Sequence, residues 1–268
     1  MARYKLILAY DGTDFEGSQR QTRWSGSGAS HHISRPRTVQ GELESALREL
    51  GWSGRSVTLA GRTDSGVHAS GQVAAFDFEW PHSLEKLRDA LNANLPVDMA
   101  VRSVELADAK FNPRFDATSR LYQYSLFCQN VRDPLREKLA WRVWPAIDES
   151  LLVETAQIFL GRHDFAAFGS APRKESSTVR TVSLSAWRKI EGEWQYEVRA
   201  DAFLYRMVRR LVYVQVAVAQ GRCSKEVVAK SLEKPQFKNQ IPAGLAPAHG
   251  LALVEVTYQS CPSKENGD

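Results

Sequence analysis

Hydrophobic and polar positions alternate at the start of the chain and change to a helical spacing before residue 50. Residues 4–10 alternate and are rich in residues that favour strands, and turn-forming residues 11–14 follow them. Thr38 is a residue type that caps helices, and apolar residues follow it at the spacing of one helix face: Val39, Leu43, Ala46, Leu47 and Leu50. The pattern predicts an N-terminal strand and a helix that begins just after Thr38.

The segment between these two elements has a different composition. Residues 24–37 contain glycine, serine and proline without a periodic apolar pattern. Such a stretch predicts a mobile loop. The connection from Thr22 to Arg37 also carries Arg23 and Arg35.

Strands and helices are mixed along the rest of the chain. Apolar alternation predicts strands at residues 56–60, 72–78, 101–106, 120–130, 182–190, 194–200 and 251–258. Helical spacing predicts helices at residues 84–91, 151–160, 203–219 and 225–232. Each half follows the order β-α-β-β-α-β, the split βαβ pattern. We predict an α+β fold in which two similar halves, residues 1–116 and 117–268, form a mainly antiparallel sheet with a central cleft.

Composition places the chain among soluble globular proteins. Its 268 residues are 43% apolar and 25% charged. No apolar run approaches the roughly 20 residues that span a bilayer, and the N-terminus lacks the features of a signal peptide. We therefore expect a cytoplasmic protein without a membrane partner.

Cysteine, histidine and charge narrow the chemistry further. The three cysteines and six histidines are scattered, without CxxC, HxxxH or HExxH spacing, so the sequence predicts no metal site and no disulfide framework. The net charge is +4, and most of the 35 basic residues are arginine. Arginine offers a planar fork of donors to phosphate oxygens, so the composition is compatible with a phosphate-rich partner.

One glycine-rich motif stands between two predicted strands. Residues 61–69 read GRTDSGVHA, with Asp64 between two glycines, Arg62 two residues before it and His68 four residues after it. Glycine permits a tight backbone and close approach of a ligand. By itself, however, an aspartate in such a loop is more often a turn residue or a helix cap than a nucleophile.

This motif resembles the signature loop of the TruA family of tRNA pseudouridine synthases. Further blocks along nearly the whole chain resemble the same family in the same order: residues 10–13, 17–21, 38–44, 91–96, 111–117, 163–165, 180–182, 203–209 and 246–251. Several independent blocks in order are much more specific than one motif.

The resemblance implies the pseudouridine synthase fold and the isomerisation of uridine to pseudouridine at positions 38, 39 and/or 40 of the tRNA anticodon stem-loop. Members of the family resemble homodimers in which one tRNA crosses both subunits. The reaction breaks the N1–C1′ bond, turns the uracil and rejoins it through C5. Because no redox change occurs and no atom is gained, no cofactor and no metal are expected.

The same resemblance assigns three catalytic residues. Asp64 is the nucleophile, although attack at C1′ and elimination to a glycal both remain open. Arg209 is the cation that keeps this carboxylate charged in a pocket emptied of water. Tyr122 is expected to stack on the target base and to remove the C5 proton late in the reaction, while Tyr124 on the same strand face is a core alternative.

The helix predicted from residue 203 has two unlike sides. At about 100° per residue, its apolar residues occupy one half-turn, and the other half-turn holds Tyr205, Arg206, Arg209, Arg210 and Tyr213. This helix can therefore pack in the core and offer guanidinium groups to a cleft. A solvated basic face is the ordinary alternative.

Eight further residues are predicted to contact substrate: Arg62, Thr63, His68, Leu251, Arg20, Arg114, Arg206 and Arg210. A base inside a folded RNA arm must leave its stack before a carboxylate reaches it. Leu251 is expected to pack on that base, and Arg62 to fill space or bind phosphate; His68 has an equal claim to a hydrogen bond within the loop. Arg20, Arg114, Arg173, Lys174 and Arg180 are candidates for backbone contacts that position RNA.

Three features depart from the family pattern. Ser18 stands where the family usually has tryptophan, and Arg210 where it often has asparagine. The 22–37 connection is longer than usual, and we expect it to order on RNA. Three alternative functions remain: a synthase for another RNA, a non-catalytic RNA-binding protein of this fold, and a hydrolase using Asp64 and His68.

Overall fold

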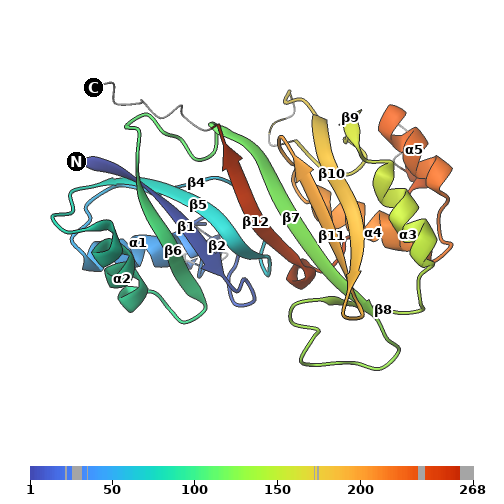
Figure 1. Ribbon diagram of the computed structural model, residues 1–268, viewed down its shortest axis with the longest axis horizontal. Coiled ribbons are helices and arrows are strands. Elements are labelled where there is room, and N and C mark those ends of the chain that lie inside the picture. Colours follow the sequence, from blue (N-terminus) through green and yellow to red (C-terminus); the bar gives the residue numbers. More distant parts are fainter. Residues whose placement is uncertain are drawn as a thin grey trace, which may run out of the picture.

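The computed structural model describes residues 1–21, 23–25, 32–34, 36–171, 173, 175–234 and 239–259, with side chains for all of these except 23–25 and 32–34. A large sheet runs through the molecule, and the helices lie at its two ends and along one face (Figure 1). This architecture confirms the predicted α+β class.

The strands and helices that the apolar pattern predicts occur in the predicted order, and the second half contains two further short strands, at residues 141–143 and 161–164, that the pattern did not predict. In the first half the strands are β1 (Ala2–Tyr10), β4 (Thr58–Leu59), β5 (His68–Phe78) and β6 (Met99–Ala107), with helices α1 (Val39–Glu49) and α2 (Leu84–Asn94). In the second half the strands are β7 (Ala117–Cys128), β8 (Trp141–Val143), β9 (Gly161–Asp164), β10 (Val179–Ile190), β11 (Glu193–Ala200) and β12 (Leu251–Tyr258). The second-half helices are α3 (Glu149–Gln157), α4 (Met207–Ala219) and α5 (Lys225–Glu233), and a 3₁₀ turn spans Ala248–Gly250.

The sheet joins two copies of one topology. Its order is β6-β1-β5-β12-β7-β11-β10-β9, with β4 beside β5 and β8 beside β7. With the short β8 and β9 left aside, four strands in each half therefore follow the same order, with the last strand beside the first, then the third and the second: β6-β1-β5-β4 and β12-β7-β11-β10. All pairs are antiparallel except β12 with β5 and β7 with β8. The two similar halves and the mainly antiparallel sheet are thus as predicted.

Strand β5 forms the junction between the halves. One edge of β5 pairs with β12 near its start, at His68 and Ala69, and with β4 further along, at Ala74 and Ala75. The neighbours of β5 diverge there, and the connection from β4 to β5 leaves the sheet at that fork. Residues 60–67, which contain the glycine-rich motif, form this connection.

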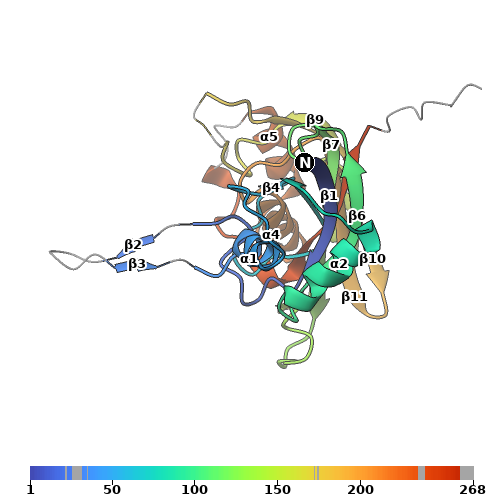
Figure 2. The same cartoon turned by 90° about the vertical axis from the view of Figure 1, so that its left-hand side faces the viewer.

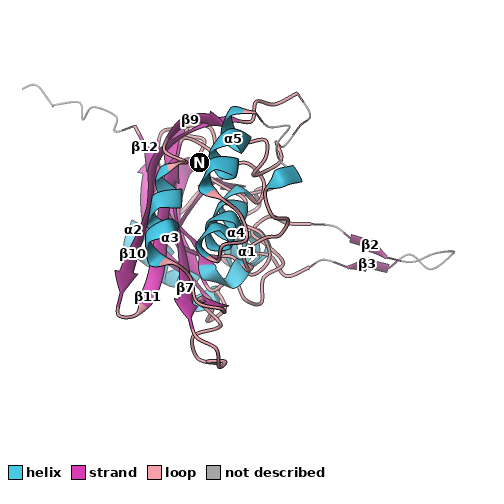
Figure 3. Ribbon diagram, turned by 90° about the vertical axis from the view of Figure 1, so that its right-hand side faces the viewer, coloured by secondary structure: helices cyan, strands magenta, loops and turns pink. Residues whose placement is uncertain are grey.

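Helices α1, α3 and α4 lie on the same side of the sheet (Figure 3). Thr38 caps α1 as predicted, because its side chain accepts a hydrogen bond from the backbone N–H of Gly41. The apolar stripe of α1 is buried, and ten of the residues of α4 are buried as well. These two helices enclose the side of the sheet onto which the 60–67 loop opens.

The predicted start of the helix at residue 203 is wrong. Helix α4 begins at Met207, and Arg206 before it adopts the left-handed conformation with φ 62° and ψ 10°. The preceding residue is held in a bridge, in which Tyr205 N–H donates to Ser170 O at 3.0 Å and Ser170 N–H donates to Tyr205 O. This long-range pairing keeps the backbone out of the helix, and a local periodicity cannot reveal it.

The predicted loop at residues 24–37 is wrong at residues 24–25 and 32–34, which form strands, and correct at residues 36–37. Strand β2 (Arg23–Ser25) pairs antiparallel with β3 (His32–Ser34), and this hairpin projects from the body beside α1 (Figure 2). Strands of three residues are too short to show an alternation in sequence. Residues 22, 26–31 and 35, which include Arg35, lie outside the described residues.

Arg37, at the end of this connection, is not free. Its guanidinium binds both carboxylate oxygens of Asp98 at 2.7 and 2.8 Å, and its Nε donates to Glu42 at 2.9 Å. The same group lies 4.3 Å from the centre of the Phe15 ring. These partners hold Arg37 in the folded protein, so it does not belong to a segment that orders only on RNA.

The described residues contain neither a membrane-spanning helix nor a metal-binding cluster. None of the helices there is long and apolar enough to cross a membrane. Nor do three or more histidine, cysteine, aspartate or glutamate side chains gather there in an arrangement that could hold a metal ion.

Candidate active site

The loop that carries Asp64 is fixed by buried hydrogen bonds. Thr63 N–H donates to the Ser18 hydroxyl at 2.8 Å, and Ser18 N–H donates to Thr63 O at 3.1 Å. The hydroxyl of Thr63 also bonds the hydroxyl of Tyr10 at 2.9 Å. Both Ser18 and Thr63 are buried. Three hydrogen bonds, two with Ser18 and one with Tyr10, therefore hold Thr63 immediately before Asp64.

A second clamp holds the beginning of the same loop. Gln72 is fully buried on β5, and its amide bonds both backbone groups of Gly61: Gly61 N–H donates to Oε1 at 3.3 Å and Nε2 donates to Gly61 O at 2.9 Å. The amide also reaches the hydroxyl of Tyr10 at 3.4 Å. Buried polar groups that are fully bonded make a structure rigid, so these contacts preorganise the loop.

Two glycines allow the turn after β1 to approach this loop. A Cβ atom at Gly12 would lie 2.0 Å from the carbonyl oxygen of Val67, which no side chain permits. Gly17 has φ +93°, a region that favours glycine. The Gly-Ser sequence therefore brings Ser18 into the reach of Thr63.

We expect Ser18→Ala to destabilise the fold by about 1–3 kcal/mol, because the substitution leaves the buried Thr63 N–H without its acceptor. The control is Ser70→Ala, the same substitution at an exposed position of β5, for which we expect a change within about 0.5 kcal/mol. Urea unfolding of both variants measures the difference. Equal midpoints for the two variants would show that the Ser18 hydroxyl does not hold the loop.

The structure brings Asp64 and Arg209 together from opposite halves of the chain. Arg209 Nη1 donates to Asp64 Oδ2 at 2.9 Å, and the two side chains are only 15% and 22% exposed. The Nε of Arg209 donates to Ala246 O at 2.8 Å, which orients the guanidinium. Arg206 adds a second positive charge, with its Nε 4.0 Å from Asp64 Oδ2. The carboxylate of Asp64 thus has one bound guanidinium and a second one nearby.

Tyr122 and Tyr124 occupy the same face of β7 but differ in their contacts. The hydroxyl of Tyr124 donates to Pro247 O at 2.9 Å, and the residue is fully buried. In the described part of the chain, the Tyr122 hydroxyl makes no hydrogen bond, and a Cβ at Gly61 would lie 3.9 Å from it. Tyr122 therefore presents a free hydroxyl beside the Asp64 loop, while Tyr124 belongs to the core.

Burial raises the pKa of the Tyr122 hydroxyl well above its ordinary value, and the nearby Tyr10 and Asp64 add to the effect against the opposing influence of Arg120. The hydroxyl therefore stays protonated at neutral pH in the free protein. The ring packs edge-on against Phe203, with 5.0 Å between ring centres.

His68 is committed to the protein interior. Its Nδ1 accepts from Gly12 N–H at 2.9 Å, and its Nε2 lies 3.0 Å from His249 O. The carboxylate of Asp11 also lies close to this ring, with its Oδ1 3.1 Å from Nδ1. The geometry favours the structural hydrogen bond over a contact with substrate. It also ties the Asp64 loop to the 3₁₀ turn that precedes Leu251, which is itself buried opposite Tyr124.

The other predicted contact residues fall into two groups. Arg62 and Arg114 are exposed on the loops that carry them. Arg20 pairs with the buried Glu44 at 2.6 Å, and Arg210 Nη1 donates to the carbonyls of Pro242 and Gly244. The first group can reach a ligand directly, whereas the second is partly engaged by the protein.

The three remaining candidates for backbone contacts differ as well. Arg173 is exposed, and Lys174 lies outside the described residues. Arg180 donates from Nη1 to Ser177 O at 2.9 Å and to Val179 O at 2.6 Å, while its Nε is buried without a partner. Of the two candidates that the structure describes, Arg173 is therefore the one free to meet an RNA backbone.

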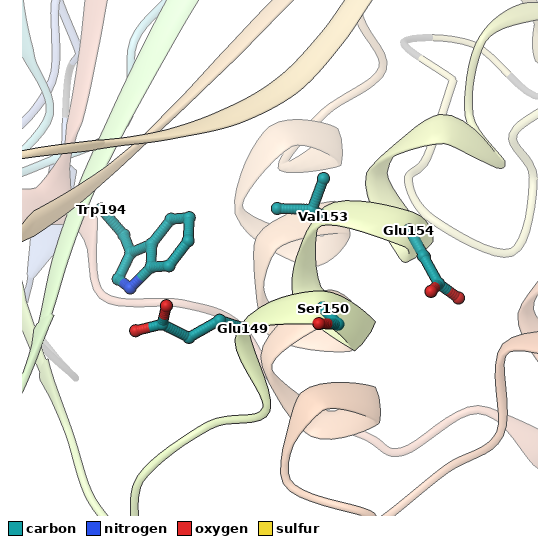
Figure 4. Close-up of a pocket in the computed structure, with 5 residues that line it drawn as sticks. All are labelled: Glu149, Ser150, Val153, Glu154 and Trp194. Atoms are coloured by element: carbon teal, nitrogen blue, oxygen red, sulfur yellow. The ribbon is translucent and has the colours of Figure 1, made fainter.

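Two depressions mark the surface. One, of about 270 Å³, adjoins Asp64 through Arg206 and contains Tyr205 and Arg210. The other, of about 420 Å³, lies against Trp194 and the first turns of α3 (Figure 4) and contains no predicted site residue. The acidic groups of the latter are neutralised, because Glu149 pairs with Lys189 and Glu154 with Lys225. The smaller depression, which lies beside Asp64, is therefore the better candidate for a ligand site.

Sequence reasoning overlooked Gln72 and Tyr205 as contributors to the site. Gln72 is a polar residue immediately before the apolar residues 73–76 of β5, and its full burial is the signal that only the fold provides. Ser18 was visible as a departure from the family pattern, but its bond to Thr63 was not. Tyr205 was assigned to a helix face, whereas it lies in the extended segment before α4.

Comparison with known proteins gives a family. The family model described as "tRNA pseudouridine synthase" matches residues 8–116 and 155–259. A curated relative, tRNA pseudouridine synthase A of Chloroflexus aurantiacus, is 38% identical over 96% of this chain and 89% of its own length. The proteins of the same name from Methylacidiphilum infernorum (39%, over 95% of each chain) and Brevibacillus brevis (37%, over 96% of this chain and all of the relative) are similar throughout.

A solved structure is also similar, but only distantly. It is a chain in the crystal structure of a Cbf5-Nop10-Gar1 complex, with a TM-score of 0.33 and 13% identity over 68% of this chain and 40% of that chain. That likeness carries no argument here. The family match extends over both halves of the sheet and includes the loop of Asp64 as well as β11 and β12, the two strands that pair with Tyr122's strand. The chain belongs to the TruA family of tRNA pseudouridine synthases and is an isomerase that forms pseudouridine in tRNA.

Proposed function

We propose that this enzyme converts uridine to pseudouridine at positions 38, 39 and/or 40 of the tRNA anticodon stem-loop, with Asp64 as its nucleophile. The observation that carries the proposal is the bond between Asp64 and Arg209, at 2.9 Å across the junction of the two halves. A carboxylate held ionised by an oriented guanidinium is the group that this isomerisation needs beside the ribose.

The reaction balances without any added reagent. The bond between N1 and C1′ breaks, and the uracil leaves with its electron pair while Asp64 stabilises or bonds the ribose carbon. After the base turns, C5 forms the new bond to C1′. C5 then loses its proton, and N1 ends with a proton. Substrate and product are isomers, so no group is consumed.

Tyr122 is proposed to contact the uracil. Its free hydroxyl lies next to the Asp64 loop, and its ring stands on the same face of β7 as the core residue Tyr124. Because its pKa is raised, the neutral phenol acts first as a hydrogen-bond partner. Removal of the C5 proton by Tyr122 then requires that the bound base and Arg120 favour its ionised form.

Arg62 and Leu251 complete the proposed target site. Arg62 is exposed two residues before Asp64, where a nucleotide that leaves its stack would be met. Leu251 lies in the strand that joins the halves, across from Tyr124. Arg114 and Arg173, which are both exposed, are proposed to contact phosphates of the arm.

We further propose that the two halves, residues 1–116 and 117–268, act together as one unit in a cytoplasmic homodimer. The β5–β12 pairing and the Asp64–Arg209 bond both cross between these halves. Sedimentation velocity tests the dimer, and a mass of one chain at micromolar concentration would contradict it.

The experiment that tests the function measures tritium released from tRNA labelled at uracil C5. We expect release from an unmodified tRNA transcript without nucleotide, metal or reductant. Transcripts in which uridines 38, 39 and 40 are replaced by cytidine, singly and together, locate the target: the triple replacement should abolish release.

Ribosomal RNA fragments with the same label distinguish a synthase for another RNA. Release from these fragments but not from any tRNA would contradict the substrate proposed here. Release that persists in the triple-replaced tRNA would contradict the positions alone.

A further inference from the structure

The depression beside Asp64 is a built feature of the fold. Its volume is about 270 Å³, and its floor consists of the small residues Ala166, Ala167, Gly169 and Ser170. The turn that carries these residues is locked to the segment before α4, because a Cβ at Gly169 would lie 2.7 Å from the Cβ of Leu204. Its shape therefore does not depend on a mobile element.

Tyr205 forms one wall of this depression, and its side chain has no evident structural role. Its backbone is pinned by two hydrogen bonds with Ser170, yet the residue is 55% exposed. Among the residues that the structure describes, no other aromatic ring contacts it, and its ring partner is the guanidinium of Arg206 at 4.8 Å. A large aromatic ring on a fixed backbone is available to stack on a ligand.

Two guanidinium groups line the same depression and have N–H donors that are not hydrogen-bonded within the described residues. Arg206 is 48% exposed and makes no hydrogen bond from its side chain within the described ranges. Arg210 uses Nη1 for two backbone carbonyls, which leaves Nε and Nη2 unbonded in the described part of the protein. The left-handed conformation of Arg206, unusual for a residue other than glycine, places it between the depression and Asp64.

These groups together match a nucleotide. An exposed aromatic ring stacks on a base of any sequence, and arginine binds the phosphate beside it. Pockets for drug-sized ligands measure roughly 300 to 1,000 Å³, so a depression of about 270 Å³ suits one base and not a folded RNA arm.

We propose that this depression is a second nucleotide subsite, which binds the nucleotide next to the target uridine with its base on Tyr205 and its phosphate on Arg206. The position of Arg206 argues for a neighbouring nucleotide, because this residue lies 4.0 Å from Asp64 on one side and against the Tyr205 ring on the other. The subsite rests on the proposed function in one respect: the target uridine is taken to lie at Asp64.

The test is a thermodynamic cycle on RNA binding, made in the Asp64→Asn background so that no turnover occurs. The probes are an anticodon stem-loop RNA and two versions that lack the base on the 5′ or the 3′ side of the target uridine. We expect Tyr205→Ala to weaken binding of the intact RNA about 10-fold, within the roughly 5- to 100-fold range of a base–aromatic stack. One abasic RNA should weaken binding by a similar factor.

The coupling between Tyr205→Ala and the removal of the RNA base decides whether Tyr205 stacks on that base. If Tyr205 stacks on the missing base, the abasic RNA loses no further affinity in the Tyr205→Ala protein, and Tyr205→Phe behaves like the parent. The control is Trp144→Ala, an aromatic residue exposed to a similar degree, 57%, at the end of β8; there the abasic penalty should stay at its full value. Circular dichroism and unfolding midpoints confirm that each variant is folded.

Two results would overturn the subsite. In the first, the abasic RNA loses the same factor of affinity in the Tyr205→Ala protein as in the parent. In the second, neither abasic RNA binds the parent more weakly than the intact RNA does. Failure of the proposed function gives a different result. In that case wild-type protein releases no tritium from tRNA, whatever the coupling at Tyr205. A protein that turns over but shows no coupling retains its function and loses the subsite.

Discussion

Replacement of Asp64 by asparagine should abolish tritium release, with a loss in kcat of at least about 10⁴-fold. Asparagine has the size of aspartate and can still accept the hydrogen bond that Arg209 donates at 2.9 Å. It lacks the negative charge that stabilises or bonds C1′ when the base departs. Single-turnover release from tRNA labelled at uracil C5 measures the effect.

RNA binding by the Asp64→Asn protein should stay within a few-fold of wild type, because contacts to phosphates supply most of the affinity. The matched control is Asp89→Asn on α2, whose carboxylate is exposed and paired with Arg88; it should keep full activity. Retention of even a tenth of the wild-type rate by Asp64→Asn would remove Asp64 from the role of nucleophile.

Replacement of Arg209 by methionine should lower kcat by about 10- to 100-fold and change KM much less. A hydrogen bond between charged groups contributes roughly 1.5–3 kcal/mol, and both partners here are largely shielded from water. Without the guanidinium, the carboxylate of Asp64 loses its orienting donor, while Arg206 at 4.0 Å supplies only weaker compensation.

Two further variants separate the effect of the geometry of the Arg209 guanidinium on kcat from the effect of its positive charge. Arg209→Lys keeps the charge but cannot bond both Asp64 and Ala246 from a planar fork, so its kcat should fall between wild type and methionine. Arg188→Met removes an exposed arginine of β10 that lies 3.6 Å from Glu197 and should leave kcat unchanged. Equal kcat values for the methionine variants at 209 and 188 would show that the ion pair plays no part in catalysis.

Ser18 illustrates how one departure from a family pattern can be read in three dimensions. Tryptophan is usual at this position, and sequence alone raises a question about substrate choice. The structure places Ser18 beneath the Asp64 loop, where its hydroxyl accepts a hydrogen bond from Thr63 N–H and its own N–H donates to Thr63 O. A small hydroxyl residue thus fixes the loop by direct bonds to its backbone.

The sequence determined the elements and their order. Alternation and helical spacing are local consequences of which face of each element is buried, so they predicted β12 at residues 251–258 and the turn between β10 and β11 as the structure has them. The motif blocks determined the family, and with it Asp64, Tyr122 and Arg209 as candidates. These features depend on residue types at fixed spacings along the chain.

Only the tertiary structure decided which of the candidates meet. The bond between Asp64 and Arg209 joins residues 145 positions apart, and the difference between Tyr122 and Tyr124 depends on Gly61 and Pro247, neither of which is near them in sequence. Likewise, the bridge from Ser170 to Tyr205 makes the helix begin four residues later than predicted, and the ring of His68 is bound between Gly12 and His249. Periodicity records whether a residue is buried; which distant atoms satisfy its polar groups is set by the packing of the two halves.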